Sequence, residues 1–136
     1  MYKLTDLFKV LSDETRLRIL VLLYNKELCV CQLQGILEEE SQPKISKHLA
    51  KLRDMGFVND ERKEKFIYYY LNDNKRLKNV LKSIIENSDE YEVIKDDLER
   101  LKYADEIRKE KCVKIKIERA IRMIWNVLNT FGFMFI

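Results

Sequence analysis

The chain has 136 residues, of which 46% are hydrophobic and 36% are charged. This length predicts one domain with an appended tail and excludes a large multidomain enzyme. The formal charge of +3, from 26 basic and 23 acidic residues, does not require a nucleic-acid partner unless the positive charge is locally concentrated. Only 3 glycines and 1 proline exclude Pro-rich low complexity and favour a mostly helical fold.

Cysteine usage and hydropathy indicate the compartment. Three cysteines, an odd number, do not form a disulfide framework. The first residues lack the apolar stretch of a signal peptide, and no segment reaches the roughly 18 uncharged apolar residues of a membrane span. We therefore expect a cytoplasmic protein with reduced thiols and no stable membrane insertion.

Two helices are predicted at the start of the chain. The first covers about residues 4–11, because its apolar residues repeat on one helical face. These residues are Leu4, Leu7, Phe8 and Leu11. Ser12 or Asp13 then caps a second helix that is apolar nearly all round over residues 17–24. Such a helix is expected to be buried at the centre of the fold.

A third and a fourth helix follow after a short polar segment. The third is predicted over about residues 28–37, and residues 38–41 form a polar break. Ser41 or Gln42 begins the fourth, with Pro43 in its first turn, where the missing N–H costs nothing. Gly56 ends it.

The apolar period then changes to that of strands. Residues 57–58 and 66–71 are rich in aromatic and β-branched side chains and predict a two-stranded hairpin. The connection over residues 60–65 is charged and contains no Gly or Asn, so we expect a longer, irregular loop. Asn72 or Asp73 caps another helix that ends near residue 87.

The remaining third of the chain changes character twice. Residues 89–111 are dense in charge and are interpreted as a solvated helix with few contacts. Residues 112–136 combine a local excess of basic side chains with a helical apolar stripe. The stripe contains Ile117, Ile121, Ile124, Trp125 and Leu128. We expect this tail to pack on a dimer core, and a helix lying on an anionic membrane is the alternative.

This order of elements predicts a mainly α fold with a β-hairpin, the winged helix-turn-helix. Residues 1–87 are assigned to a DNA-binding and sensing domain, and residues 88–136 to a helical extension.

Positive charge is concentrated in the fourth helix. Residues 41–53 carry four basic residues and no acid, while the whole chain carries +3. The apolar spacing of this helix turns one set of side chains outward: Lys44, Ser46, Lys47, His48 and Lys51. With Gln42 at its start, the helix has donors and acceptors that can read base edges in a major groove.

The hairpin supplies a second set of candidate DNA contacts. Arg62, Lys63 and Lys65 lie in the charged connection and can follow backbone phosphates, although Glu61 and Glu64 reduce the net charge of the loop.

Several stretches together resemble the ArsR/SmtB family of metal-responsive transcriptional repressors. They are LSDETRLRIL (11–20), QPKISKHL (42–49), LRDMGFV (52–58) and YYYL (68–71). The resemblance covers about residues 4–87 and implies a homodimer, built from the first and last helices of the core, that occupies operator DNA and leaves it when an inducer binds. It places DNA reading on Gln42, Lys44, Ser46, Lys47 and His48. The wing departs from the family pattern because it has no glycine at its tip.

Cys29 and Cys31 form a Cys-x-Cys pair, and two thiolates suit a soft, thiophilic ion. On a regular helix, however, residues two apart point about 200° away from each other, so both thiols reach one ion only if the helix start is distorted. Spacing alone favours the interpretation that one cysteine is a small buried hydrophobe and the other an inert surface thiol.

The family resemblance favours the ion-binding interpretation. ELCVCQL over residues 27–33 is similar to the motif that holds trivalent arsenic or antimony in the arsenic-responsive branch of the family. Three thiolates are usual there, but position 34 is Gln, so Cys112 in the tail is the candidate third ligand, with solvent or a small thiol as the alternative. A His-rich zinc site is disfavoured because the chain has 1 His. Cadmium, another thiophilic ion, stays an alternative, because a dimer can assemble several thiols.

Redox sensing is the alternative function of the cysteine pair. Cys29 and Cys31 can instead form a disulfide or a sulfenic acid, which would make the protein a redox sensor without bound metalloid. An enzyme is not expected, because glycines occur only at positions 35, 56 and 132, which excludes a Gly-rich phosphate loop.

Overall fold

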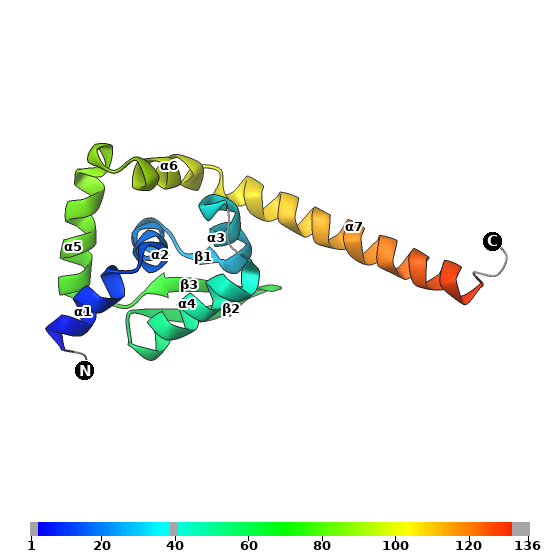
Figure 1. Ribbon diagram of the computed structural model, residues 1–136, viewed down its shortest axis with the longest axis horizontal. Coiled ribbons are helices and arrows are strands. Elements are labelled where there is room, and N and C mark those ends of the chain that lie inside the picture. The colour runs from blue at the N-terminus through cyan, green and yellow to red at the C-terminus, as the bar shows by residue number, and fades with distance from the viewer. Residues whose placement is uncertain (1–2, 39–40, 132–136) are drawn as a thin grey trace.

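The computed structural model describes residues 3–38 and 41–131 and is mainly helical (Figure 1). The elements follow in the order α1 (Leu4–Leu11), α2 (Glu14–Asn25), β1 (Leu28–Cys29), α3 (Val30–Leu37), α4 (Gln42–Asp54), β2 (Val58–Lys63), β3 (Phe66–Leu71), α5 (Lys75–Glu86), the 3₁₀ turn η1 (Ser88–Glu90), α6 (Glu92–Leu101) and α7 (Ala104–Thr130). The pair α3–α4 followed by the β2–β3 hairpin confirms the predicted winged helix-turn-helix.

The small sheet contains one strand more than the sequence indicated. Its order is β1-β3-β2, and both pairings are antiparallel. Leu28 and Cys29 were predicted to begin a helix, but they pair with Tyr69 and Tyr68. A two-residue strand has too few positions to show a period of two, and the helix therefore begins only at Val30.

The predicted irregular loop of the wing is also wrong. β2 continues through Lys63, and the hairpin turns at Glu64 and Lys65. Glu64 adopts a φ of 57°, a left-handed conformation that usually belongs to Gly or Asn. Charged residues continue the strand here because the tip of the wing extends beyond the core and both of its faces are exposed.

Side-chain caps define the starts of three helices. Asp13 accepts from the backbone N–H of Arg16 at 2.9 Å, and Ser41 accepts from that of Lys44 at 3.4 Å, as predicted. The cap of α5, however, is Asn74, which accepts from Leu77 at 3.0 Å. Asn72, one of the two predicted caps, is otherwise engaged, because it donates to the carbonyl of Gly56 and accepts from Asn59.

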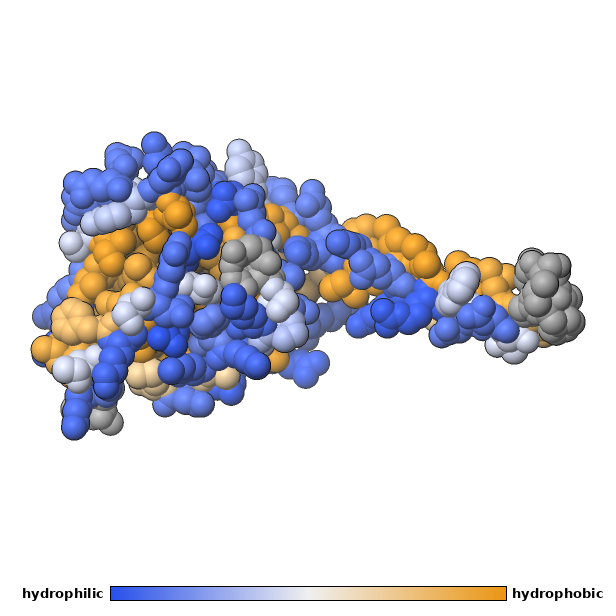
Figure 2. Space-filling model, viewed as in Figure 1, coloured by the Kyte–Doolittle hydropathy of each residue, from blue (hydrophilic) through white to orange (hydrophobic). Residues whose placement is uncertain are grey.

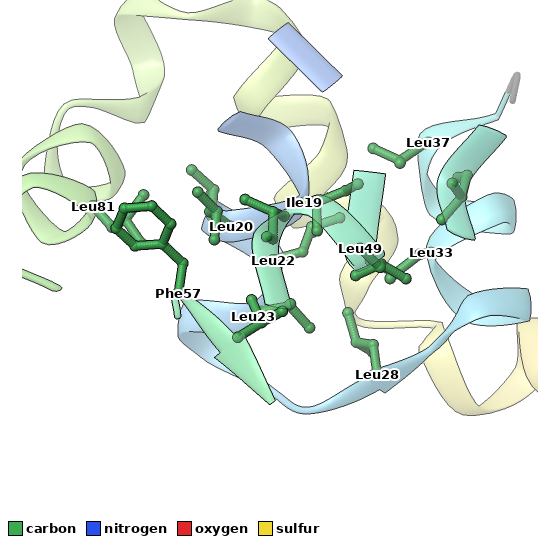
Figure 3. Packing of buried hydrophobic residues seen from close by; sticks show 14 of the residues in the cluster. Ile19, Leu20, Leu22, Leu23, Leu28, Leu33, Leu37, Leu49, Phe57 and Leu81 are labelled. Atoms are coloured by element: carbon green, nitrogen blue, oxygen red, sulfur yellow. The ribbon is translucent and has the colours of Figure 1, made fainter. Parts of the chain in front are cut away.

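The core forms around α2 (Figure 3). Residues 19–23 of this helix are all buried, as expected for a helix that is apolar nearly all round. α3 and α4 cover it through Leu33 and Leu49, and Phe57 and Leu81 close another side. Loss of a buried Leu side chain from such a core costs about 2–5 kcal/mol.

The charge-dense segment after residue 88 is not the solvated helix that was predicted. Ile94 and Asp97 of α6 are buried, and the Asp97 carboxylate accepts from both Arg18 and Arg100. Charge is tolerated in this position because each charged group has a partner of opposite sign. The core continues to Ala104, beyond the predicted domain boundary at residue 87.

α7 leaves the body of the protein as a straight arm (Figure 1). Residues 113–131 are all exposed, so one protomer does not provide the packing predicted for the tail. Their apolar side chains form a band along the arm (Figure 2), which includes Val113, Ile117, Ile121, Ile124, Trp125 and Leu128. Within the described residues, no helix is long and apolar enough to cross a membrane.

The two halves of α7 use opposite faces. Ala104, Arg108 and Cys112 follow each other at four-residue intervals and form the face toward the body. Ile117 lies nine residues after Arg108, and at about 100° per residue this places it half a turn away. The exposed apolar band therefore faces away from the protomer's own core.

Candidate sensing site and DNA interface

The thiols of Cys29 and Cys31 meet at the junction of β1 and α3. Their Sγ atoms are 2.9 Å apart, and the exposed fractions are 2% for Cys29 and 6% for Cys31. They converge because Cys29 is not part of the helix: it is the N-cap residue, with extended backbone (φ −89°, ψ 167°). The 200° separation of a regular helix therefore does not apply to this pair, and the condition for both thiols to reach one ion is met. The alternative of one surface thiol is wrong, because both cysteines are buried.

The pKa values of the two thiols are shifted in opposite directions. The hydrogen bond from the Cys31 thiol lowers the pKa of Cys29 to about 7, against the opposing effect of burial. Backbone N–H groups and the Arg108 guanidinium also lower it. The pKa of Cys31 is raised, because its proton is held in the hydrogen bond to Cys29 and because the thiol is buried. At most one of the two thiols is therefore ionised near neutral pH, and that one is Cys29.

A buried glutamine connects this pair to α7. The backbone N–H of Cys29 donates to Oε1 of Gln32 at 3.0 Å, and Nε2 of Gln32 donates to the carbonyl of Ala104 at 3.1 Å. Sequence reasoning missed Gln32, although Cys29-x-x-Gln32 has the spacing of a capping box, which could have indicated it.

Arg108 and Tyr68 form the next part of the site, and neither was predicted. Tyr68 is the register partner of Cys29, and its hydroxyl accepts a hydrogen bond from Arg108. The Arg108 guanidinium also lies 5.8 Å from the ring centroid of Phe66. No local pattern signals these contacts, because they join residues 40 positions apart.

Cys112 lies one turn beyond Arg108 on the same face of α7 and is half-buried. It belongs to the face by which α7 packs against α3, the helix whose first turn holds Cys31. Within residues 3–38 and 41–131, no three His, Cys, Asp or Glu side chains are already assembled as a metal site.

The chemistry of Cys29 and Cys31 fits a soft ion. Both donors are sulfur, one is readily deprotonated, and their sulfur atoms already touch. Thiolates of this kind select thiophilic ions over magnesium or calcium, which prefer oxygen.

α4 presents the predicted DNA-reading residues on its outer face. Ile45, Leu49 and Leu52 are buried against the core. The opposite side exposes Gln42, Lys44, Ser46, Lys47 and Lys51, and His48 is half-buried. Arg53 pairs with Asp60 of β2 at 2.8 Å and so joins α4 to the wing.

The predicted wing cations are all exposed, but their surroundings differ. Arg62 lies near the end of β2 and Lys65 in the turn. Lys63 pairs with Glu27, just before β1, and its ammonium lies 5.7 Å from the ring centroid of Tyr68. The wing is thereby connected to the strand that carries Cys29.

Comparison with known proteins identifies the family. Residues 13–60, from the cap of α2 into β2, match the model of bacterial regulatory proteins of the arsR family. An HTH-type transcriptional regulator of Methanocaldococcus jannaschii is 38% identical over 85 residues, which are 62% of this chain and 93% of that protein.

Two further relatives have names that describe a ligand or a resistance. The arsenic resistance transcriptional regulator ArsR2 of Pseudomonas putida is 53% identical over 68 residues. The match is 49% of this chain and 58% of that protein, so the chain spans little more than half of this relative. The crystal structure of the AntR antimony-specific transcriptional repressor is 28% identical, with a TM-score of 0.53 over 63% of this chain and 79% of that one. With the winged helix-turn-helix and these matches together, the chain belongs to the ArsR family of bacterial regulatory proteins.

Proposed function

We propose that the protein is a transcriptional repressor that occupies operator DNA as a homodimer and leaves it when trivalent arsenic or antimony binds Cys29 and Cys31. The observation that carries the proposal is the buried contact of the two sulfur atoms, 2.9 Å apart, beside the helix-turn-helix. The names of an arsenic resistance regulator and an antimony-specific repressor among its relatives support this choice of inducer.

Arsenite binding needs no change of oxidation state. In neutral water arsenite is As(OH)₃, and each thiol that replaces a hydroxide forms one As–S bond and releases one water. Two thiols leave one hydroxide on arsenic. Because Cys29 is largely ionised above a pKa of about 7, it makes the first attack, and its S–H partner Cys31 follows.

The position of the pair gives the inducer access to both DNA-contacting parts. Cys29 belongs to β1, which shares a sheet with the wing, and Cys31 lies in the first turn of α3, which leads into α4. A bond to arsenic draws in the end of the strand and the start of the helix together. The wing and α4 then no longer fit the same stretch of DNA.

DNA recognition is assigned to α4 and the wing. Gln42, Ser46 and His48 contact base edges in the major groove, and the lysines contact phosphates. The phosphate contacts are Lys44, Lys47, Lys51, Arg62, Lys63 and Lys65. Residues 1–87 supply DNA binding and the thiol pair, and the extension, residues 88–136, contributes to the core as far as Ala104.

The homodimer is assigned to α1 and α5. Leu4 and Phe8 of α1 are half or more exposed, and α5 is strongly amphipathic. A second protomer buries this surface and sets two copies of α4 one helical turn of DNA apart. A regulator of this kind works in the cytoplasm, where the DNA is, and it has no catalytic role.

The test is release of labelled promoter DNA, taken from upstream of the protein's own gene, measured by fluorescence anisotropy under reducing conditions. The wild type is expected to bind and to dissociate when arsenite is added. The Cys29→Ser/Cys31→Ser variant is expected to bind equally well and to remain bound. Val30→Ala, between the two cysteines, is the matched control and should respond like the wild type. Arsenite release of the double variant would remove the sensing assignment.

The DNA assignment has its own test. Lys44→Ala/Lys47→Ala should weaken binding and reduce the slope of log affinity against log salt by roughly 2, because two phosphate contacts are lost. Lys95→Ala/Lys102→Ala removes the same charge from exposed positions of the α6 region and should change the slope little. Equal slopes for the two variants would contradict the role of α4.

Redox sensing is the second candidate, and the same sulfur contact favours it. A thiolate of pKa about 7 beside a thiol is the arrangement from which a disulfide forms when an oxidant accepts two electrons. In that case mild peroxide releases the DNA and arsenite does not.

A further inference from the structure

The first half of α7 packs closely against α3. Gln32 donates to the carbonyl of Ala104. At Gly35, an added Cβ would lie 2.2 Å from Cγ2 of Ile107, so the two helices approach at a distance that only glycine permits. Arg108 extends the contact to Tyr68 and Phe66 of the wing sheet.

Cys112 is the last residue of this contact face. It follows Ala104 and Arg108 at four-residue intervals, and it is half-buried, whereas every position from 113 to 131 is exposed. Arg108, one turn before it, lies next to the register partner of Cys29. The contact face therefore leads along α7 past the thiol pair, with a third sulfur in the following turn.

We propose that Cys112 supplies the third thiolate to the arsenic held by Cys29 and Cys31, so that the inducer bonds α7 to the start of α3. This rests on the function proposed above. The third thiol replaces the remaining hydroxide, giving one further As–S bond and one further water, with no electron transfer. Cys112 lies on the face of α7 that packs against α3, the helix whose first turn carries Cys31.

The three sulfur atoms are not yet assembled, and this gives the ligand a mechanical role. Bonding of Cys112 moves the turn around residues 108–116 toward α3. α7 is a continuous helix of 27 residues, about 40 Å long, so a small shift at this end is a larger displacement at the other. The position of the arm therefore depends on whether the inducer is bound.

The experiment combines native mass spectrometry with amide hydrogen exchange, on full-length protein with arsenite as the probe. Wild-type protein is expected to bind arsenic without hydroxide and to show slower exchange over residues 108–116. Cys112→Ser should keep the hydroxide on arsenic, lose the protection, and bind arsenite at least about tenfold more weakly, since even outer-shell changes cost a metal site that much. Its circular dichroism should match the wild type, because the substitution is small and the site half-buried.

A thiol on the wrong face is the matched control. Cys112→Ser/Val113→Cys keeps the number of thiols and moves one by a single residue to the exposed side of α7. It should behave like Cys112→Ser. Wild-type behaviour of this variant, or of Cys112→Ser itself, would overturn the role of Cys112 while leaving the Cys29–Cys31 site intact. If the Cys29→Ser/Cys31→Ser variant also binds arsenite normally, the proposed function itself fails.

Discussion

The two ends of α3 are both held in place, but by different chemistry. At the C-terminal end, Arg18 and Arg100 donate to the carbonyls of Leu37 and Ile36, and both are anchored by the buried carboxylate of Asp97. At the N-terminal end, the partners are two thiols and the amide of Gln32.

The contacts at one end of α3 are permanent, whereas those at the other end can change. The arginine pair satisfies the last carbonyls of α3 just before the turn to α4, and its charge is permanent. The thiol pair shares a proton and can exchange that proton for a bond to a soft ion. α3 is therefore fixed at the end that leads into α4 and adjustable at the other.

The largest expected effect is on the fixed end. Asp97→Ala leaves Arg18 and Arg100 without their shared carboxylate in a buried position, and breaking a buried pair from one side costs about 3–5 kcal/mol. Urea unfolding measures the loss. Asp96→Ala removes the same charge from the neighbouring residue and should change the free energy of unfolding by less than about 0.5 kcal/mol. Similar losses for the two variants would show that Asp97 does not anchor α3.

A smaller effect is expected from the amide at the adjustable end. Gln32→Ala leaves the buried N–H of Cys29 without its side-chain partner and removes the bridge to the carbonyl of Ala104, at a cost of about 1–3 kcal/mol. Gln34→Ala, on the same helix but half-buried, is the control. The variant should also exchange amide hydrogens faster at the start of α7. An unchanged exchange rate there would contradict the bridging role of Gln32.

The smallest effect is on the thiols, and it depends on pH. Thiolate absorbance in the ultraviolet should rise in a step centred near pH 7, because the pKa of Cys29 is lowered from its ordinary value of 9.0. Cys29→Ser should lose the step, and Cys31→Ala should move it upward, since the donor to the thiolate is gone. The absence of a step near pH 7 in the wild type would contradict the shared proton.

The lowered pKa of Cys29 also makes the free energy of unfolding depend on pH. A depressed folded-state pKa means that the contribution of Cys29 is fully present above the unfolded value of 9.0 and is lost as the pH falls through about 7. The stabilisation of the Cys29 thiolate is therefore weakest in mild acid.

Periodicity predicted the regular parts of this fold well. The apolar run of α2 and the spacing of Ile45, Leu49 and Leu52 gave the central helix and the outward face of α4, because burial repeats with the helical turn. The pairing partners were beyond its reach. Asp97 looked like one more solvated charge, since nothing local indicates an arginine 79 positions earlier.

For the thiol pair, the error in the predicted start of α3 affected the expected geometry of the site. If Cys29 belonged to a regular helix, its sulfur would face away from that of Cys31. Because Cys29 is instead the N-cap residue, the two sulfur atoms are in contact. The strand that corrects this has two residues and exists only because Tyr68 and Tyr69 lie alongside it. Its pairing depends on contacts between distant parts of the chain, which a local pattern does not contain.

The opposed faces of α7 have a consequence for the reading frame of the helix. Removing one residue between positions 112 and 117 leaves the contacts of Ala104, Arg108 and Cys112 unchanged, yet it rotates everything beyond by about 100°. The apolar band would then face a different direction, while the rest of the protein keeps its structure. Chain length in this short stretch, rather than any single side chain, sets the direction in which the arm offers its apolar surface.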